Sequence, residues 1–511
     1  MRAGKQGSGR RPKGAGAEKA AEQMLSLEQA AEVLGVSRST MHRWQQQGRI
    51  RGTRIGRQWR YRRSDLDKLG QATHPSAAAV NVSQLDGALA DLSSRARAAG
   101  EIVFDAVVPG YPATEEEKAV VSAFRTILAT ALEAGATDIH IDAARGESVV
   151  RQRIDGVLHE MLRVPKSSHD ALVACIKAHA GIPLDQRGIP QDGRFGFQFG
   201  DRKFDTRAAT IPAVFGESVV MRLLDQKATL IRLDGPHGMY PEDLAKYRRA
   251  LHQPCGLLIV SGPTGSGKTT IMYAGLLEIA NPEVKTMSIE DPVEYSFPHV
   301  TQVAVNRKAG LTFEAGLRSF LRHDPDVIMI GEIRTLEAAE TAAQIAITSH
   351  LVMTVLHAET AAGCVTRLLD MGLEPFMVAQ TLIYVSAQRL ARRVCPECKQ
   401  PDEPDLKLLS SLAERARRGG YELPDKPQFM RGAGCDHCRH TGYRGRTGLY
   451  EVMEIDREIQ RLIARRAATE EIEAAAIRNG MRTLAADGLR KTAEGITSVA
   501  EVARVVSESR E

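Results

Sequence analysis

The sequence predicts a multidomain protein whose largest part is an α/β domain with a parallel sheet. Strand-like and helix-like segments alternate from 256 to 357, which is the order that builds such a sheet. Within this stretch, a glycine-rich segment lies between an apolar run, 256–261, and a helix-compatible run that starts at Thr270. The length of 511 residues exceeds what one hydrophobic core supports, so further domains are expected.

The glycine-rich segment, 262–269, fits the pattern G-x-x-x-x-G-K-[ST] of a phosphate-binding P-loop. Its glycines let backbone amides point at a polyphosphate, and the following helix adds partial positive charge at its N-terminus. Lys268 is expected to reach the β- and γ-phosphates, and the Thr269 hydroxyl to ligate Mg²⁺. The expected contacts to ATP and Mg²⁺ are therefore Gly262, Pro263, Thr264, Gly265, Ser266, Gly267, Lys268, Thr269 and Thr270.

Carboxylates further along the chain suit the other needs of phosphoryl transfer to water, which are metal coordination and orientation of the water. Glu332 follows an apolar run, so it is expected at a strand end, where ligands collect in open α/β sheets. Glu290, Asp291 and Glu294 form a second acidic cluster, which is expected to contain the general base. Taken singly, any one of these carboxylates could be a solvated strand end.

Together these segments resemble the type II secretion and type IV pilus assembly ATPases. The resemblance runs from about Ala136 to Glu451. It is carried by the segments 136–141, 153–156 and 190–194, the P-loop, an Asp box at 290–294, a Walker B segment at 324–334 and a His box at 350–357.

The resemblance implies a ring-shaped homohexamer with ATP between a RecA-like domain and a smaller, PAS-like α+β domain that precedes it. Arg194, Arg207 and Arg222 match the arginines of the smaller domain that contact phosphates; surface salt bridges are the alternative for each. The His box adds His357 to the expected catalytic residues and His350 to the expected nucleotide contacts. The resemblance also implies a cytoplasmic protein, peripheral at the inner membrane, whose partner is an inner-membrane platform protein.

The sequence departs from the pattern of these ATPases in two places. Thr335 follows the Gly-Glu-Ile-Arg segment where the family usually has Asp, and 358–360 reads Ala-Glu-Thr where the family usually has Thr-Asn-Asp. Lys268, Glu332 and both histidines of the His box are retained, so ATP hydrolysis is expected. The departures bear on coupling between subunits.

Seven cysteines fall into two groups. Cys175, Cys255 and Cys364 are isolated and are expected as small core residues. Two C-x-x-C pairs contain the others, which are Cys395, Cys398, Cys435 and Cys438. Four thiolates on two tight turns predict a tetrahedral, structural Zn²⁺ site, and the secretion ATPases have a similarly long insert between the pairs. A thioredoxin-like redox role is the alternative.

The segment 25–69 predicts a winged helix–turn–helix. An amphipathic helix at 27–34, a turn and a second helix at 38–47 are followed by an alternating stretch, 51–63, that suits a hairpin with Gly56-Arg57 at its turn. A third helix starts at Ser64. This arrangement resembles the excisionase-like DNA-binding proteins.

The charge of this region favours an anionic partner, because residues 1–70 carry 16 Lys and Arg against 6 Asp and Glu. Trp44 and Trp59 are expected in its core. The expected contacts to duplex DNA are Arg38, Ser39, Thr40, His42 and Arg43 in the second helix and Arg54, Arg57 and Arg60 in the wing. The alternative is an adaptor that docks on a protein or a membrane surface.

The expected domains are a disordered basic tail at 1–24, the winged helix–turn–helix at 25–70, a linker at 71–113, the α+β domain at 114–228, the RecA-like core at 229–390, the zinc-binding subdomain at 391–450 and C-terminal helices at 451–511. No apolar run approaches the roughly 18 residues of a membrane span. The expected function is a hexameric ATPase that powers secretion or pilus assembly. The alternative is a DNA-binding regulator whose ATPase ring senses nucleotide.

Overall fold

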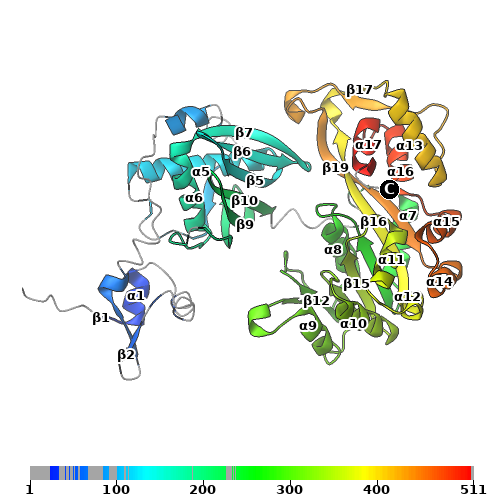
Figure 1. The fold of residues 1–511 in the computed structure, drawn as a ribbon, viewed down its shortest axis with the longest axis horizontal. Coiled ribbons are helices and arrows are strands. Elements are labelled where there is room, and N and C mark those ends of the chain that lie inside the picture. The colour runs from blue at the N-terminus through cyan, green and yellow to red at the C-terminus, as the bar shows by residue number, and fades with distance from the viewer. Residues whose placement is uncertain are drawn as a thin grey trace, which may run out of the picture. The chain divides into compact units, whose positions relative to one another are not determined.

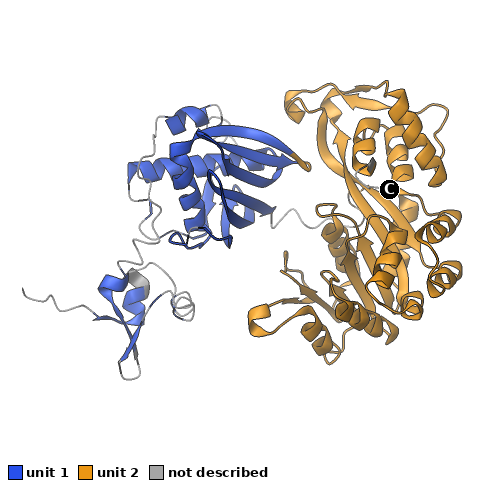
Figure 2. Ribbon diagram, in the orientation of Figure 1, with its two compact units in different colours: residues 1–154, 158–224 blue, residues 155–157, 225–511 orange. Residues whose placement is uncertain are grey.

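The computed structural model describes residues 24–33, 41, 45, 50, 52–55, 58–66, 84–90, 92, 100–106, 108, 111–112, 114–186, 188–225, 233, 235 and 238–507. The chain divides into two compact units (Figure 2). The first unit comprises residues 1–154 and 158–224, and the second comprises 155–157 and 225–511. Across the described residues, no helix combines the length and apolar character that crossing a bilayer requires.

The N-terminal part of the first unit contains a helix and a three-stranded sheet. Helix α1 (Leu27–Val33) accompanies strands β1 (Met24–Leu25), β2 (Thr53–Ile55) and β3 (Gln58–Arg62), whose order is β1-β3-β2. The antiparallel β2–β3 pair confirms the predicted hairpin. Its small core consists of Leu25, Ala30, Met41, Ile50, Tyr61 and Leu66.

One expectation for this core is wrong, because Trp59 is 38% exposed. Trp59 pairs with Arg54 next to the last pair of the hairpin, and the cluster that buries Tyr61 does not extend that far. The predicted turn at Gly56-Arg57, most of the second helix and Trp44 lie outside the described residues.

The rest of the first unit is a seven-stranded sheet with two helices, α5 (Glu115–Glu133) and α6 (Lys166–His179). The strand order is β4-β8-β9-β10-β5-β6-β7. Figure 1 labels β5, β6, β7, β9 and β10 of this sheet beside α5 and α6. The strands are β4 (Ile102–Phe104), β5 (Ala136–Ala143), β6 (Glu147–Ile154), β7 (Val157–Pro165), β8 (Gln191–Phe199), β9 (Arg202–Ala213) and β10 (Gly216–Asp225). Strand β4 comes from the segment that was expected to be a linker. The α+β composition is as expected, and the PAS-like comparison stays a prediction.

Helix α5 begins with a capping box after Thr114. Thr114 Oγ1 accepts from the Glu117 amide at 3.2 Å, and Glu117 Oε2 accepts from the Thr114 amide at 3.1 Å. This reciprocal capping box satisfies two amides that the first helical turn leaves without partners. The buried face of α5 then packs on the sheet in one cluster with α6.

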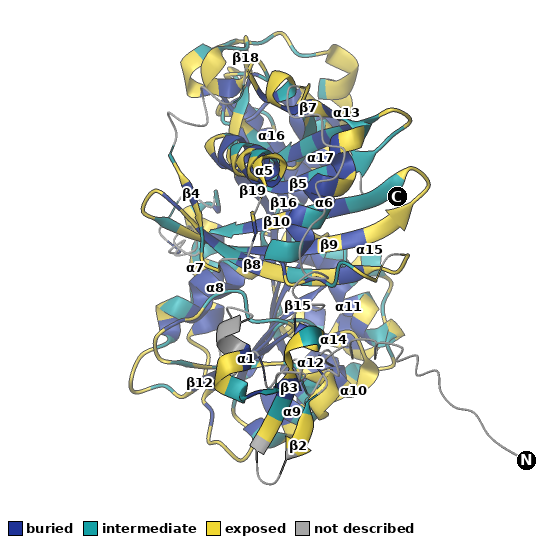
Figure 3. Cartoon of the chain, turned by 90° about the vertical axis from the view of Figure 1, so that its left-hand side faces the viewer, coloured by how far each residue is buried: buried dark blue, intermediate teal, exposed yellow. Residues whose placement is uncertain are grey.

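The second unit contains the predicted parallel α/β sheet, in the order β13-β12-β14-β15-β11-β16-β19. All pairs are parallel up to β16, and β16 pairs with β19 in the antiparallel sense. The strands are β11 (Gly256–Ser261), β12 (Thr286–Glu290), β13 (Val300–Ala304), β14 (Val327–Ile330), β15 (Leu351–Leu356), β16 (Leu382–Val394) and β19 (Tyr443–Glu454). Strands β11, β14 and β15 are buried along their whole length, as Figure 3 shows for β15.

Helices cover both faces of this sheet, and each face has its own hydrophobic core. One core contains side chains of α7 (Pro241–Leu251) and α8 (Lys268–Ile279). The other contains side chains of α9 (Phe313–Phe320), α10 (Leu336–Ile347), α11 (Ala361–Asp370), α12 (Pro375–Thr381), α14 (Arg457–Ala464) and α15 (Thr469–Arg478). Burial on both faces explains why these strands read as continuous apolar runs in the sequence.

The insert between the cysteine pairs joins the C-terminal helices. Strands β17 (Lys399–Pro401) and β18 (Met430–Gly432) pair with each other. Helix α13 (Leu406–Arg418) packs with α16 (Leu484–Ala493) and α17 (Val499–Ser507) in one hydrophobic cluster. The insert and the C-terminal helices therefore share a core.

Candidate functional site

The predicted P-loop lies between strand β11 and helix α8. Gly262, Gly265 and Gly267 have φ angles of 142°, 79° and 85°, which L side chains rarely adopt. These glycines allow the chain to turn sharply, so that the N-terminus of α8 directly follows the loop. Lys268, the first residue of α8, folds back over the loop, and its Nζ donates to the carbonyls of Gly262 at 2.8 Å and Pro263 at 2.7 Å.

Lys268 is buried, and its charge is sensitive to its surroundings. Burial, and after it the charge of Arg389, lower the pKa of Lys268 to about 8, against the opposing effect of the charge of Glu332. The ammonium group thus lies close to a second cation and to the carboxylate that the sequence singled out. An anionic ligand at the loop would favour the protonated form of Lys268.

Glu332 lies just beyond the carboxyl end of β14, at the same sheet edge as the loop. Its Oε1 accepts from Arg334 at 2.5 Å, and its Oε2 lies 3.5 Å from His357 Nε2. Burial alone would raise the pKa of Glu332, but the nearby Arg334 and His357 outweigh it, so the pKa lies below its ordinary value. The carboxylate is therefore ionised at neutral pH, as metal coordination or water orientation requires.

A hydroxyl connects the P-loop strand to the His box. Ser261 Oγ donates to the Ala358 carbonyl at 2.8 Å and accepts from the Ala358 amide at 2.9 Å. Ser261 is the last residue of β11, and Ala358 directly follows His357. This pair of hydrogen bonds fixes the segment that carries His357 next to the start of the loop.

Glu290, at the end of β12, is buried and receives three side-chain hydrogen bonds. Its carboxylate accepts from the Tyr273 hydroxyl, from Ser288 Oγ at 2.5 Å and from Gln302 Nε2 at 3.2 Å. Burial, together with the charge of Glu290, raises the pKa of Tyr273 above its ordinary value. Because Tyr273 belongs to α8, this carboxylate connects the helix of the P-loop to the Asp box.

The other two carboxylates of the Asp box lie nearer the surface. Asp291 is exposed, and its Oδ2 lies 3.2 Å from Arg307 Nη2. Glu294 is half-buried, and its charge is felt by Tyr273. The structure therefore gives the three carboxylates of the Asp box different surroundings, and only Glu290 is fully enclosed.

His350 lies at the opposite edge of the sheet from the P-loop. Its carbonyl accepts from the amide of Gly256, the first residue of β11, whereas the loop follows the last residue of β11. Its Nδ1 lies 3.2 Å from the Ile345 carbonyl at the end of α10. Within one chain, the structure brings His357 to the loop edge and does not bring His350 there.

The three arginines expected to contact phosphates all belong to the sheet of the first unit. Arg194 on β8 lies directly opposite Arg207 on β9. Arg222 on β10 is 53% exposed in its side chain and bonds to Asp138 at 2.9 Å. Contact between these arginines and nucleotide stays a prediction.

Two residues beside the loop carried no signal in the sequence. Gln388 and Arg389 lie on β16, where the strand continues past the end of β11. The sequence did not distinguish them, because the segment 382–394 also contains Ser386, Arg392 and Arg393 among its apolar residues.

The four cysteines of the C-x-x-C pairs come together as predicted. Their sulfur atoms all lie within 4.8 Å of one another, with separations of 3.9 Å for Cys395 and Cys435, and 3.7 Å for Cys398 and Cys438 and for Cys435 and Cys438. A tetrahedral site with Zn–S bonds of about 2.3 Å requires sulfurs about 3.8 Å apart. Disulfide sulfurs lie about 2.05 Å apart, so this geometry fits a metal and not a disulfide.

Backbone amides support the sulfur cluster. The amide of Gly434 donates to Cys398 Sγ at 3.3 Å, and the amides of Cys435 and Gly442 both donate to Cys438 Sγ at 3.2 Å. Amide donors stabilise thiolates, which are the metal-binding form of cysteine. The residues present therefore fit a structural Zn²⁺ ion held by four thiolates.

The expected DNA contacts are only partly described. Arg54 on β2 is exposed, and Arg60 on β3 is half-buried. The other expected DNA contacts lie outside the described residues; they are Arg38, Ser39, Thr40, His42, Arg43 and Arg57.

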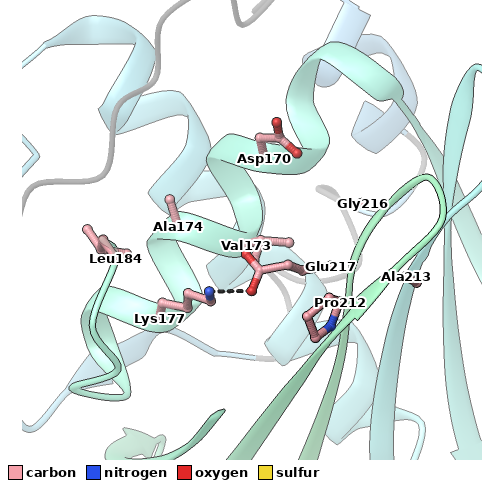
Figure 4. Close-up of a pocket in the computed structure, with 9 residues that line it drawn as sticks. All are labelled: Asp170, Val173, Ala174, Lys177, Leu184, Pro212, Ala213, Gly216 and Glu217. Carbon is pink, nitrogen blue, oxygen red and sulfur yellow. Dashed lines mark hydrogen bonds and ion pairs between the residues drawn. The ribbon is translucent and has the colours of Figure 1, made fainter. Parts of the chain in front are cut away.

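A pocket of about 220 Å³ lies in the first unit, between α6 and the β9–β10 turn (Figure 4). Buried Lys177 forms an ion pair with Glu217 in its wall and donates to Gln191 at 2.8 Å. Val173, Leu184 and other apolar side chains complete the lining. Lys177 and Glu217 thus bond to each other in the pocket wall, which suits a structural role.

Comparisons with known proteins agree with this geometry. Residues 113–504 match the family described as type II/IV secretion system protein, and residues 24–71 match the helix-turn-helix domain family. The chain is 41% identical to the type II secretion system ATPase E of Vibrio cholerae over 398 residues, which cover 78% of this chain and 77% of the relative. It is also 41% identical to the type IV pilus assembly ATPase PilB of Myxococcus xanthus over 391 residues, which cover 76% and 68%.

Solved structures show the same fold. The ATPase DotB of Legionella pneumophila matches with a TM-score of 0.53 at 18% identity, covering 76% of this chain and 95% of that one. The pilus retraction motor PilT with bound ADP matches with a TM-score of 0.50 at 24% identity, covering 74% and 94%. The family match spans both the seven-stranded sheet of the first unit and the P-loop sheet of the second. The chain therefore belongs to the type II/IV secretion system protein family.

Proposed function

We propose that this protein is a hexameric, Mg²⁺-dependent ATPase that powers assembly of a pilus or pseudopilus, in type II secretion or in a type IV pilus system. The observation that carries the proposal is the convergence of Lys268 and Glu332 at one edge of the parallel sheet, close enough for the carboxylate to affect the pKa of the lysine. The similarity to secretion and pilus assembly ATPases at about 40% identity supports it.

The residues of the loop edge have distinct roles in this proposal. Lys268 holds the β- and γ-phosphates of ATP, and Thr269 would hold Mg²⁺. Glu332 would orient the attacking water and help to hold Mg²⁺, and His357 keeps the carboxylate of Glu332 in place. The carboxylate of Glu290 already accepts three side-chain hydrogen bonds, so its role is to hold the Asp box against the helix of the P-loop. Glu294 is therefore the general base of the Asp box.

In the proposed ring, Arg194, Arg207 and Arg222 supply positive charge to the phosphates. A guanidinium suits spread phosphate charge better than an ammonium group does. The ring acts at the cytoplasmic face of the inner membrane, on an inner-membrane platform protein. Thr335 caps α10, because its hydroxyl accepts from the Ala338 amide at 3.3 Å. The threonine that replaces the family's usual Asp thus has a local structural role.

Hydrolysis by the purified full chain tests the proposal. We expect ATP turnover that requires Mg²⁺, a particle mass of six chains, and loss of turnover in Lys268→Ala. The matched control is Glu337→Gln, because Glu337 is an exposed glutamate on α10 that pairs with Arg318. A wild-type chain that neither binds nor hydrolyses ATP, with a folded structure, would refute the proposed activity.

We propose a second function for residues 25–70, which is binding of duplex DNA. The match of residues 24–71 to the helix-turn-helix family and the excess of basic residues in 1–70 favour it. Such binding should weaken steeply with salt, because each neutralised phosphate releases counterions. Arg54→Ala should reduce affinity for all sequences alike.

Gel-shift or anisotropy measurements test whether the full chain binds duplex DNA. They are made at several salt concentrations, with random and enriched duplexes. Turnover measured with and without duplex DNA separates a motor from a nucleotide-sensing regulator. If the full chain does not bind duplex DNA at low salt, the adaptor interpretation replaces this proposal.

A further inference from the structure

Strand β16 places two polar residues beside the glycine loop. It runs parallel to β11 with Ala387 opposite Ser261, so β16 continues past the point where β11 ends. Gln388 and Arg389 are its next residues, and they lie alongside the loop. Both are buried, with exposures of 3% and 7%.

The loop approaches Gln388 so closely that two of its positions admit only glycine. A Cβ on Gly262 would lie 2.3 Å from the Gln388 carbonyl oxygen, and a Cβ on Gly267 would lie 2.8 Å from Gln388 Nε2. Real Cβ atoms do not approach other atoms this closely. The two ends of the loop therefore pack directly against the backbone and the side chain of Gln388.

Two buried polar atoms at this contact have no hydrogen-bond partner among the described residues. Among the hydrogen bonds of the described residues, neither Gln388 Oε1 nor Ser266 Oγ takes part in one. Leaving a buried polar atom without a partner costs about 1–3 kcal/mol, so such atoms need an explanation. Their position in the wall of the P-loop points to a polar ligand.

Arg389 adds positive charge beside this contact, because its Nη1 lies 3.4 Å from the Gln388 carbonyl oxygen, the atom that a Cβ on Gly262 would meet. Its charge disfavours protonation of Lys268, whereas the charge of Glu332 favours it. Arg389 also affects the buried carboxyl of Glu451 on β19. Burial raises the pKa of Glu451 to about 7, and the charge of Arg389 opposes that rise. Two buried cations repel each other, and a polyphosphate relieves that repulsion.

We propose that Gln388 and Arg389 belong to the nucleotide site. Arg389 binds the phosphate charge of ATP within the same chain. Gln388 is a positioning residue that holds Gly262 and Gly267 in the shape that cradles the phosphates. This inference rests on the proposed function, since it requires a nucleotide in the P-loop. The role of Arg389 differs from that proposed for Arg194, Arg207 and Arg222. Arg389 belongs to the sheet that carries the P-loop, whereas those three arginines belong to the sheet of the first unit.

Titration of the full chain with a fluorescent ADP analogue and Mg²⁺ tests Arg389. We expect Arg389→Met to raise the dissociation constant on the order of 10- to 100-fold, as loss of a hydrogen bond to a charged group does. Arg389→Lys should lie between Arg389→Met and wild type, because a lysine keeps the charge and loses the planar fork. The matched control is Arg393→Met, an exposed arginine on the same strand, which should bind like wild type.

The pH dependence of binding separates a phosphate contact from a merely structural role. Removing the charge of Arg389 raises the pKa of Lys268, so in Arg389→Met the loss of affinity at alkaline pH should begin at a higher pH. In Arg389→Lys, the loss of affinity at alkaline pH should begin at the same pH as in wild type. If Arg389→Met lowers only the melting temperature, and both the affinity and the pH midpoint are unchanged, the inference is wrong.

Gln388→Met gives an independent measurement if Arg389→Met does not fold. This variant keeps the volume and removes the amide, so it should weaken binding several-fold and leave the pH midpoint unchanged. Unchanged affinity in both Gln388→Met and Arg389→Lys would overturn the inference. A wild-type chain that does not bind the analogue would instead refute the proposed function.

Discussion

His357 Nε2 lies 3.5 Å from Glu332 Oε2, although the two residues follow different strands and are 25 positions apart in the sequence. Strands β14 and β15 are neighbours with Ile330 opposite Thr354, so their carboxyl ends bring both side chains to one edge. The Ser261–Ala358 hydrogen bonds then tie this pair to the P-loop. The contact thus joins the Walker B segment, the His box and the loop.

Nucleotide affinity should depend on pH through Lys268. Its pKa is lowered to about 8 by burial and by Arg389, so the ammonium loses its proton as the pH rises through that value. We expect the dissociation constant for Mg·ADP to be flat below pH 7 and to rise by up to about tenfold per pH unit above pH 8. Lys268→Arg, which stays protonated, should bind more weakly at all pH values and lose this rise. A wild-type affinity that does not change up to pH 10 would contradict the assignment.

The Tyr273–Glu290 contact should stabilise the second unit. Tyr273→Phe removes one of three donors to a buried carboxylate, which should cost about 1–3 kcal/mol of unfolding free energy. A double-mutant cycle with Glu290→Gln, followed by denaturant unfolding, measures the coupling. Strictly additive effects of the two substitutions would show that the contact contributes nothing.

Glu501 should make the C-terminal region sensitive to acid. It is buried and accepts from Arg504 Nη2 at 2.7 Å and from Arg392 Nη2 at 2.7 Å; these contacts outweigh burial and lower its pKa from 4.5 to about 2. A depressed folded-state pKa contributes stability that is present above pH 4.5 and is lost as the pH falls towards 2. Glu501→Gln should therefore destabilise the protein at pH 7 by roughly 3 kcal/mol, and by little near pH 2.

Thermal unfolding at several pH values measures this effect. The matched control is Glu414→Gln, an exposed glutamate on α13 that pairs with Arg418, which should stay within measurement error. Equal destabilisation by Glu501→Gln at both ends of the pH range would point to packing instead of charge.

Metal analysis should find one Zn²⁺ per chain. Removal with a chelator, or Cys398→Ser, should unfold the region after 390 before nucleotide binding is affected, because a structural metal contributes directly to local folding. The control is Cys255→Ser, a lone half-buried cysteine. Protein without zinc, in which the same cysteines form a disulfide, would reverse the assignment.

The sequence was sufficient where function imposes a pattern on neighbouring residues. The P-loop, the strand end at Glu332 and the two C-x-x-C pairs all follow from local spacing, and the structure places each as expected. Local spacing also predicted the hairpin of the N-terminal module.

Features that depend on which strands become neighbours could not be predicted from local spacing. Gln388 reaches the loop because β16 pairs with β11, although about 120 residues separate them. The separation of His350 from His357 follows from the length of β15, whose two ends lie at opposite edges of the sheet. The enclosure of Glu290 depends on α8 and β13, and the exposure of Trp59 on the limits of a small core.

Steady-state ATP hydrolysis by Glu332→Gln in the full chain, together with binding of a fluorescent ATP analogue, directly tests whether this edge of the sheet is the catalytic site. Glu332 is ionised and lies at the loop edge, so removing its charge should leave ATP bound and lower the turnover rate on the order of 10²–10³-fold. Retained binding with lost turnover is the predicted result. A Glu332→Gln variant that hydrolyses ATP as fast as wild type would contradict the assignment of this edge of the sheet as the catalytic site.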